Sequence, residues 1–431
     1  MTSWNDLIYL RISRSANDRA WDYFLPLFIA FTVSANASLS TTALLLAVRC
    51  VAGIVLVPLF TNLWTPKRAL TYAIIENLSL IGSGLALYRF NGTNLNILYL
   101  ASSFMAIESA TSKTLTSVIE KQQTVLQSQN DIDLSKANAS LVRIDLIIAA
   151  CIPFLVNYLL VHFGHQSCIA FLIGLQLLNA TLALPTSLRV ARQSSRTRTT
   201  EGLFSSSINP INNKKQDNTK QDQSKSKSSS QLPSSSISFS FTTLLHQSKS
   251  CYLILIANAL LYFTVISPNG IMLVFLKNNG LDSFWIASVS SLGQVAGVVG
   301  SYLAPLVIEK LGLHNAALVL LTGQIVCVGG VAAVIMFYSQ LDSVILSTIC
   351  ILTIFSRVGL WGIDLALRQM IQKSTDHNSR IPMFGMADSM AQCVGLCLYG
   401  IVSTNSCTFS SLTLASTLSL SVAWCCIFNQ T

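Results

Sequence analysis

The chain has 431 residues, of which 52% are hydrophobic and only 10% are charged, and its formal net charge is +9. Soluble globular domains carry about 25% charged residues, so the composition excludes a soluble protein and indicates a polytopic membrane protein. Much of the positive charge lies in one polar stretch, residues 189–249, without the basic and aromatic pattern of a nucleic-acid-binding protein. No nucleic-acid partner is therefore expected.

Apolar stretches recur along the whole chain, each long enough for a membrane-spanning helix of roughly 20 residues. Uniformly apolar runs of this length indicate helices, because the strands of a membrane barrel alternate over about ten residues. The sequence thus predicts an all-α polytopic membrane protein embedded in the lipid bilayer. We expect about twelve transmembrane helices, over residues 15–34, 39–62, 69–89, 95–119, 138–163, 167–188, 250–277, 283–308, 314–338, 342–371, 380–403 and 407–428.

A polar segment separates the sixth predicted helix from the seventh. It is rich in Ser, Lys, Gln and Asn and poor in apolar residues, so it is expected to be a disordered cytoplasmic linker. The chain then divides into a six-helix lobe over residues 1–188, the linker over 189–249 and a second six-helix lobe over 250–431. Two such lobes are the architecture of major-facilitator-type transporters, which bind substrate near the midplane and expose it alternately to either side.

Loop charges set the expected orientation. Basic residues are concentrated in alternate loops, and such loops face the cytoplasm, which places both termini on the cytoplasmic side. Two glycosylation sequons, Asn36-Ala-Ser and Asn91-Gly-Thr, fall in predicted outer loops and predict a glycoprotein. We expect the plasma membrane as the location, with an organelle membrane as the alternative.

Two acids lie in the first predicted helix, where each buried charge is costly. Asp18 and Asp22 are four residues apart and share one helical face. Carboxylate oxygens on one face suit a divalent cation. The alternative is that both acids lie in the cytosolic headgroup region as a solvated start of the helix.

Other charges lie inside later predicted helices. Asp364 and Arg368 have the spacing of an intrahelical ion pair, whereas Arg357 has no acid on its own face and needs a partner from another helix. For the remaining intramembrane charges, structural pairing is expected: Arg49, Glu108 and Lys113. The 11 cysteines show neither a disulfide framework nor a zinc spacing.

Four motifs resemble those of the ferroportins, the family of iron exporters. They are NDRAWDYF in the first predicted helix, SKANASLVRID in the fifth, LYFTVISPNGIMLVFLKNNGLD in the seventh and SRVGLWGIDL in the tenth. The last motif resembles the family pattern (S/A)RxGLWxxDL. The four occur in the family's order and span almost the whole chain.

This resemblance implies a major-facilitator fold and export of ferrous iron, Fe(II), from the cytosol by alternating access, with proton coupling as an open question. It implies metal binding by Asp18, Asp22 and Asp145, where Asp22 replaces the histidine of vertebrate members. An acid at this position makes the site harder and weakens selectivity against manganese and calcium. The resemblance also implies gating roles for four residues: Arg68, Asn138, Arg143 and Arg357.

The sequence departs from the family at its second metal site. The cysteine and histidine of vertebrate members correspond to Gly270 and Leu398, which bind no metal. Since that cysteine is also the hormone contact, hepcidin-type binding is not expected. Cys393 and Cys397 share one helical face nearby and are candidates for a substitute thiolate site, against the alternative of ordinary core cysteines.

Some family members bind calcium between the first, third and sixth helices. The corresponding residues here are Asp18, Glu76 and Gln176, while Ala183 replaces the last acidic ligand. Glu76 and Gln176 are therefore candidate secondary metal ligands in a degraded calcium site.

We thus expect a monomeric exporter of Fe(II) that also accepts other divalent cations. The alternatives are a broader cobalt, nickel or manganese transporter that loads an organelle, an organic-solute carrier of the same fold, and a non-transporting receptor. The sequence contains no nucleophile–base set, phosphate-binding loop or HExxH motif, so no enzymatic activity is expected. Apart from transported Fe(II) and calcium at the degraded site, no cofactor is expected.

Overall fold

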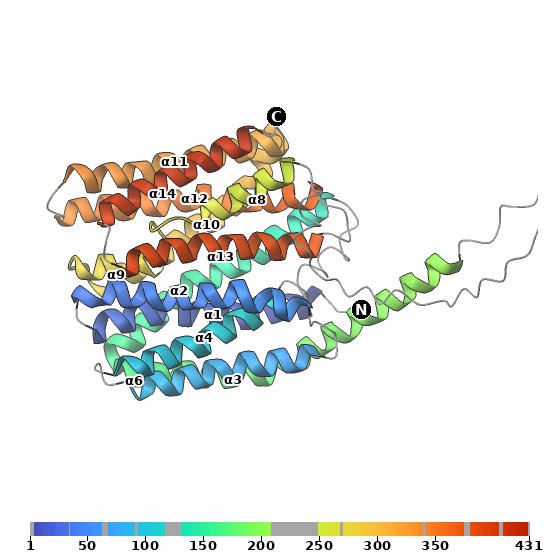
Figure 1. Ribbon diagram of the computed structural model, residues 1–431, viewed down its shortest axis with the longest axis horizontal. Coiled ribbons are helices and arrows are strands. Elements are labelled where there is room, and N and C mark those ends of the chain that lie inside the picture. Colours follow the sequence, from blue (N-terminus) through green and yellow to red (C-terminus); the bar gives the residue numbers. More distant parts are fainter. Residues whose placement is uncertain are drawn as a thin grey trace, which may run out of the picture.

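The structure, a computed structural model, describes ten segments of the chain. They are residues 4–33, 35–62, 68–90, 94–116, 131–207, 249–267, 270–338, 342–374, 380–404 and 408–429. These segments contain twelve helices and no strand. Most helices run side by side along the long axis of the molecule (Figure 1). Eight helical segments among the described residues are long and apolar enough to cross a membrane, so the chain is a multi-pass membrane protein.

The N-terminal part contains five helices. They are α1 (Trp4–Thr32), α2 (Ala35–Asn62), α3 (Ala69–Tyr88), α4 (Leu95–Leu115) and α6 (Asp131–Ser207). The long α6 contains Gly164 with a φ of 76° and a ψ of 172°, values that only glycine adopts readily. The apolar segment Ala139–Thr181 is 43 residues long, enough for two membrane crossings. The helices expected over 138–163 and 167–188 therefore both lie within α6, on either side of Gly164.

The C-terminal part contains seven helices. They are α8 (Lys249–Leu261), α9 (Ile271–Asn278), α10 (Ser283–Leu311), α11 (Leu313–Phe337), α12 (Ser343–Ser374), α13 (Arg380–Ser403) and α14 (Phe409–Phe428). The continuous helix expected over 250–277 is wrong, because α8 ends at Leu261 and α9 begins only at Ile271. Gly270, at the start of α9, has a φ of 56°, and the sequence has a proline two residues earlier. A proline lacks the helical N–H, and this glycine conformation is not helical.

The predicted linker begins as helix. Helix α6 continues to Ser207, beyond the expected helix end at residue 188, so the first part of the segment expected to be disordered is helical. Residues 208–248 lie outside the described part of the chain. The second sequon, at Asn91, also lies outside it, as do the side chains of Asn36 and Asn138.

Aromatic packing anchors α1 in the N-terminal part. The Trp21 and Phe24 rings meet edge to face with centroids 6.0 Å apart, and the Phe24 and Phe28 rings stack at 5.4 Å. All three side chains are buried. Their three- and four-residue spacing places them on one face of the helix. Phe28 also reaches out of α1 to the rings of Phe90 and His165, each with centroids 5.9 Å away. These contacts fix α1 beyond Asp18 and Asp22.

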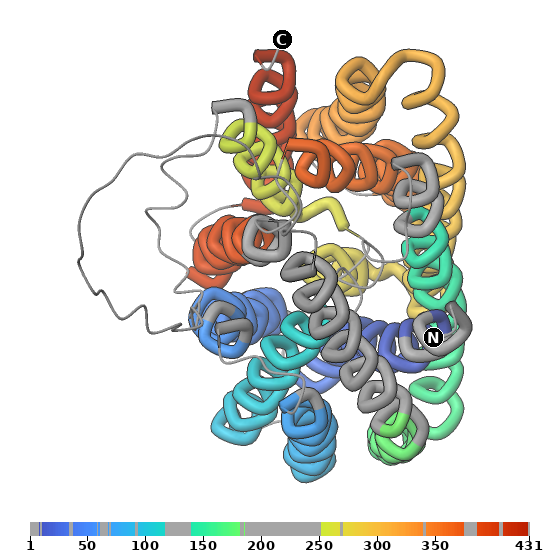
Figure 2. Tube along the Cα trace, turned by 90° about the vertical axis from the view of Figure 1, so that its right-hand side faces the viewer, coloured from blue at the N-terminus to red at the C-terminus, as the bar shows by residue number. Residues whose placement is uncertain are grey.

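The two halves of the chain meet mainly along two helix pairs. Helix α2 packs against α13, and α6 packs against α10. Figure 2 shows the N-terminal helices, blue to green, in one half of the bundle and the C-terminal helices, yellow to red, mostly in the other. In the first pair, a Cβ added at Gly53 would lie 3.1 Å from Cγ of Gln392. Glycine at this position therefore lets α2 approach α13 closely.

Candidate functional site

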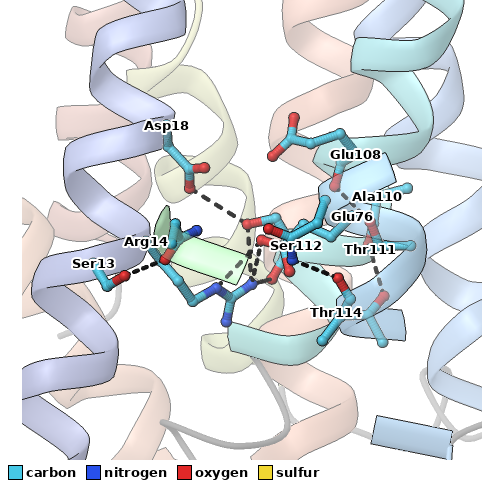
Figure 3. A network of polar contacts seen from close by, with 12 residues as sticks. Ser13, Arg14, Asp18, Glu76, Glu108, Ala110, Thr111, Ser112 and Thr114 are labelled. Atoms are coloured by element: carbon cyan, nitrogen blue, oxygen red, sulfur yellow. Dashed lines mark hydrogen bonds and ion pairs between the residues drawn. The ribbon is translucent and has the colours of Figure 1, made fainter. Parts of the chain in front are cut away.

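Three carboxylates from three helices converge within the N-terminal half. Asp18 lies on α1, Glu76 on α3 and Glu108 on α4, and one oxygen of each lies within 4.8 Å of the others. Figure 3 shows the Asp18 and Glu108 side chains approaching the same region from opposite helices. Glu76 and Glu108 are only 6% and 4% exposed, and Asp18 is half-buried. We refer to these residues as the carboxylate cluster.

The local sequence of α4 explains how Glu108 comes so close to the other helices. Small residues follow it on the buried face, among them Ser109, Ala110 and Ser112. Small residues allow helices in a membrane to approach closely. The backbone carbonyl of Glu108 accepts a hydrogen bond of 2.8 Å from the Thr111 hydroxyl within the helix, while the carboxylate extends away from α4 (Figure 3).

The Glu108 carboxylate has no direct neutralising contact in the described part of the chain, although Arg49 attracts it from beyond ion-pair distance. Within the described part of the chain it makes no hydrogen bond or ion pair, and it is directed toward the cluster (Figure 3). An unpaired carboxylate in a low-dielectric interior costs several kcal/mol, and nearby acids of the same charge add to that cost. Such an arrangement is suited to an added cation.

One arginine enters the cluster. The Arg14 Nη2 and Nε atoms donate to Oε1 of Glu76 at 3.1 and 3.3 Å. Nη2 also donates to the Ser112 carbonyl at 2.9 Å and to its hydroxyl oxygen at 3.1 Å. The Ser112 hydroxyl in turn donates to Asp18 Oδ2 at 3.4 Å. Arg14 therefore offsets one of the three negative charges.

The other two acids predicted to bind metal are held by arginines. Asp22 Oδ1 lies 2.7 Å from Nη1 of Arg49 on α2. Asp145 Oδ2 lies 2.5 Å from Nη2 of Arg11 and 3.7 Å from Nη2 of Arg19. In this conformation, Asp22 and Asp145 thus form ion pairs, and neither is part of the carboxylate cluster. Their roles as metal ligands stay predictions.

The predicted secondary ligands separate into two groups. Glu76 belongs to the cluster. Gln176 is buried on α6 and donates to Oδ1 of Asn77, the residue after Glu76, at 2.7 Å. Cys393 and Cys397 are exposed free thiols on α13. Within the described residues, the group of three potential ligands includes neither thiol.

The predicted gating residues occupy different positions. Arg143 on α6 donates to the Ser301 carbonyl on α10 at 3.3 Å, so it connects the two halves. Arg357 is buried on α12, and its Nη2 donates to the Ile266 carbonyl at 3.4 Å, in the break between α8 and α9. Arg68 is exposed and precedes α3 as its N-cap residue. Asn138 lies in α6, but its side chain is outside the described part.

Sequence reasoning missed Glu108, which it assigned to structural pairing. A usable signal was present in α4. The nearest basic residue, Lys113, is five positions later, which is about 140° around a helix. The two side chains therefore do not share a face, and Glu108 needed a partner from outside its own helix.

Comparison with known families gives one match over nearly the whole chain. The family model described as Ferroportin1 (FPN1) matches residues 6–420. Solute carrier family 40 member 1 of Arabidopsis thaliana is 28% identical over 171 residues, which is 38% of this chain and 32% of that protein. Solute carrier family 40 member 1 of Oryza sativa subsp. japonica is 26% identical over 172 residues, or 37% and 34%. The alignments thus span about a third of these relatives.

Solved structures match over the full length. A bacterial homologue of iron transporter ferroportin in the inward-facing state has a TM-score of 0.68 and 17% identity, covering 99% of this chain and 98% of that one. The outward-facing state with soaked iron gives 0.69 with the same identity and coverage. The nucleoside transporter NupG gives 0.61 at 12% identity, covering 99% and 98%. These similarities confirm the predicted major-facilitator-type fold.

Proposed function

This chain belongs to the ferroportin family, a family of membrane transporters, and from that premise we propose that it carries a divalent metal ion, with Fe(II) as the leading substrate. The observation that carries this proposal is the carboxylate cluster of Asp18, Glu76 and Glu108. The iron soaked into the outward-facing bacterial homologue supports the same class of substrate.

The chemistry of the cluster defines the kind of ion that it accepts. All three side chains offer oxygen, which suits hard or borderline divalent cations. Within the cluster there is no imidazole or thiolate to favour a softer ion. Fe(II) therefore binds together with manganese and calcium as competitors, and selectivity for iron over these ions is modest.

The direction of transport is inferred from the resemblance to the iron exporters. We infer export from the cytosol, in which the ion binds to the N-terminal half and the two halves then rock about the α2–α13 and α6–α10 contacts. The contact of Arg143 on α6 with α10 is one of those that must rearrange when the halves move. The proposed location is the plasma membrane, with a monomer as the working unit.

Purified full-length protein in liposomes tests the metal site. Asp18→Asn, Glu76→Gln and Glu108→Gln should each reduce Fe(II) transport and weaken metal binding measured by calorimetry at least about tenfold, since each removes one charged ligand. Asp342→Asn is the matched control, because Asp342 is exposed at the start of α12. Transport that is indifferent to Asp18→Asn would contradict the assignment.

A broader divalent metal transporter is the second candidate, favoured by the all-oxygen donor set. Competition of Mn²⁺, Co²⁺, Ni²⁺ and Ca²⁺ against Fe(II) in the same liposomes separates this candidate from an iron transporter. Calcium that binds without being transported would indicate a regulatory ion.

An organic-solute carrier is the third candidate, since NupG, a nucleoside transporter, has the same fold. That class predicts no stabilisation of the protein by any divalent ion.

A further inference from the structure

We propose that Arg14 is a tethered cation that competes with the metal for Glu76 and thereby sets both the affinity and the charge selectivity of the site. This inference rests on the proposed function, because it concerns the same carboxylate cluster. Arg14 is a positioning and specificity residue here, since it acts on the metal through Glu76 and through its charge.

The contacts of Arg14 support this role. Its side chain and that of Glu76 are each only 7% exposed, so the pair lies inside the helix bundle. Arg14 reaches one oxygen of Glu76 with two nitrogens and shares Ser112 with Asp18. The guanidinium therefore stands beside the ligand atoms rather than at a separate surface (Figure 3).

The charges of the site explain charge selectivity. When its three carboxylates are ionised, as metal binding requires, the site with its one guanidinium has a net charge of minus two, which one divalent cation neutralises. A monovalent cation leaves a negative charge and a trivalent cation leaves a positive one. Uncompensated charge is costly in a low-dielectric interior, so the site favours divalent ions.

The same contacts predict weakened binding. A metal that takes an oxygen of Glu76 comes close to a guanidinium that already holds this carboxylate. The two positive groups repel, and Arg14 must give up part of its contact with Glu76. Binding is then weak enough for the ion to leave on the other side, which a transport site needs as much as it needs capture.

The first test measures Mn²⁺ affinity by calorimetry on the full chain in detergent. Arg14→Gln should bind Mn²⁺ at least about tenfold more tightly, because the repulsion is removed, and should transport it more slowly in liposomes because release is hindered. Arg14→Lys keeps the charge and should restore both properties toward the wild type. If Arg14 had only a structural role, Arg14→Gln would instead weaken Mn²⁺ binding.

The second test remains decisive if the unpaired Glu76 prevents Arg14→Gln from folding. Glu76→Gln alone should weaken Mn²⁺ binding, because the bound site then has an excess positive charge. Adding Arg14→Gln to Glu76→Gln removes both members of the buried pair, which proteins tolerate better than removal of one, and makes the bound site neutral again. The double variant should therefore recover most of the affinity lost in Glu76→Gln, and failure to recover it would overturn the role of Arg14.

A trivalent probe tests charge selectivity directly. Arg14→Gln should raise the affinity for Tb³⁺ by a larger factor than that for Mn²⁺, because the trivalent ion is the more strongly repelled by Arg14. Arg368→Gln is the matched control, since Arg368 forms an ion pair with Asp364 on α12, outside the cluster, and should leave the Tb³⁺ to Mn²⁺ ratio unchanged.

The outcomes separate this inference from the proposed function. Wild-type protein that binds and transports Mn²⁺, with an Arg14→Gln variant of unchanged affinity and an unchanged Tb³⁺ to Mn²⁺ ratio, would overturn the inference alone. Wild-type protein that binds no divalent ion would overturn the proposed function and, with it, the role of Arg14.

Discussion

The guanidinium of Arg143 lies over the ring of Tyr302, 3.7 Å from its centroid. The contact joins α6 of the N-terminal half to α10 of the C-terminal half. A hydrogen bond from Arg143 to the Ser301 carbonyl runs beside it. Such a cation–π contact contributes about 0.5–2 kcal/mol, depending on its exposure, which is enough to shift the balance between two conformations of similar energy.

Tyr302→Leu should therefore loosen the α6–α10 contact without unfolding the protein. We expect faster hydrogen exchange in peptides that cover residues 139–146 and 298–305, measured by mass spectrometry, together with an altered transport rate. Tyr338→Leu is the control, because Tyr338 is an exposed tyrosine at the end of α11. Equal exchange in wild type and Tyr302→Leu would show that the contact has no part in holding the two halves.

Glu108 should show opposite effects on binding and on stability. Glu108→Gln removes the charge of a buried carboxylate that forms no hydrogen bond or ion pair in the described part of the chain, so the metal-free protein should melt at a higher temperature, with a gain of about 1 kcal/mol. Metal affinity should fall by at least about tenfold, since a charged ligand is lost.

Glu309→Gln is the matched control, because Glu309 is exposed near the end of α10, and it should change neither quantity. A metal-free Glu108→Gln protein that melts at a lower temperature would indicate that Glu108 has a stabilising partner. The carboxylate would then be structural rather than held ready for a cation.

The fold was largely predictable from the sequence, whereas the site was only partly so. Apolar runs predict the helices because a helix that spans the bilayer must be apolar over most of its length. They do not reveal that Gly164 separates two membrane crossings within α6. Nor do they reveal that Gly270 precedes a new helix, α9, after a break. Both depend on a positive φ, which glycine permits but does not require.

The acids of the site were visible one by one, but their partners were not. Periodicity assigns residues to a face of a helix, yet it does not say which faces of different helices meet. Arg11 and Asp145 are 134 positions apart, so their ion pair is a tertiary feature. For the same reason Glu76 and Glu108 were not recognised as neighbours, although α3 packs against α4.

Asp22 should contribute less to metal affinity than Asp18. In the structure Asp22 pairs with Arg49, and its side chain is 35% exposed. Asp22→Asn should thus cost about 1 kcal/mol of stability through the broken ion pair, and it should weaken Mn²⁺ binding less than Asp18→Asn does in the same calorimetric titration. Equal losses of Mn²⁺ affinity in the two variants would indicate that Asp22 leaves Arg49 and becomes a ligand in the metal-bound state.

Asp22→His would then show whether an imidazole at this position improves selectivity for Fe(II) over Mn²⁺.

The break between α8 and α9 should depend on Gly270. An added Cβ would lie 3.1 Å from Cδ1 of Leu46 on α2, and the φ of 56° is unfavourable for any other residue. Gly270→Ala should destabilise the protein by about 1–2 kcal/mol and slow transport, because α9 contacts both α1 and α2 of the other half. Gly174→Ala is the matched control, since a Cβ at Gly174 on α6 meets nothing within 4 Å and alanine is favoured in a helix. Thermal melting and liposome transport of both variants test this directly, and a Gly270→Ala protein with wild-type stability and transport would show that the break tolerates other backbone conformations.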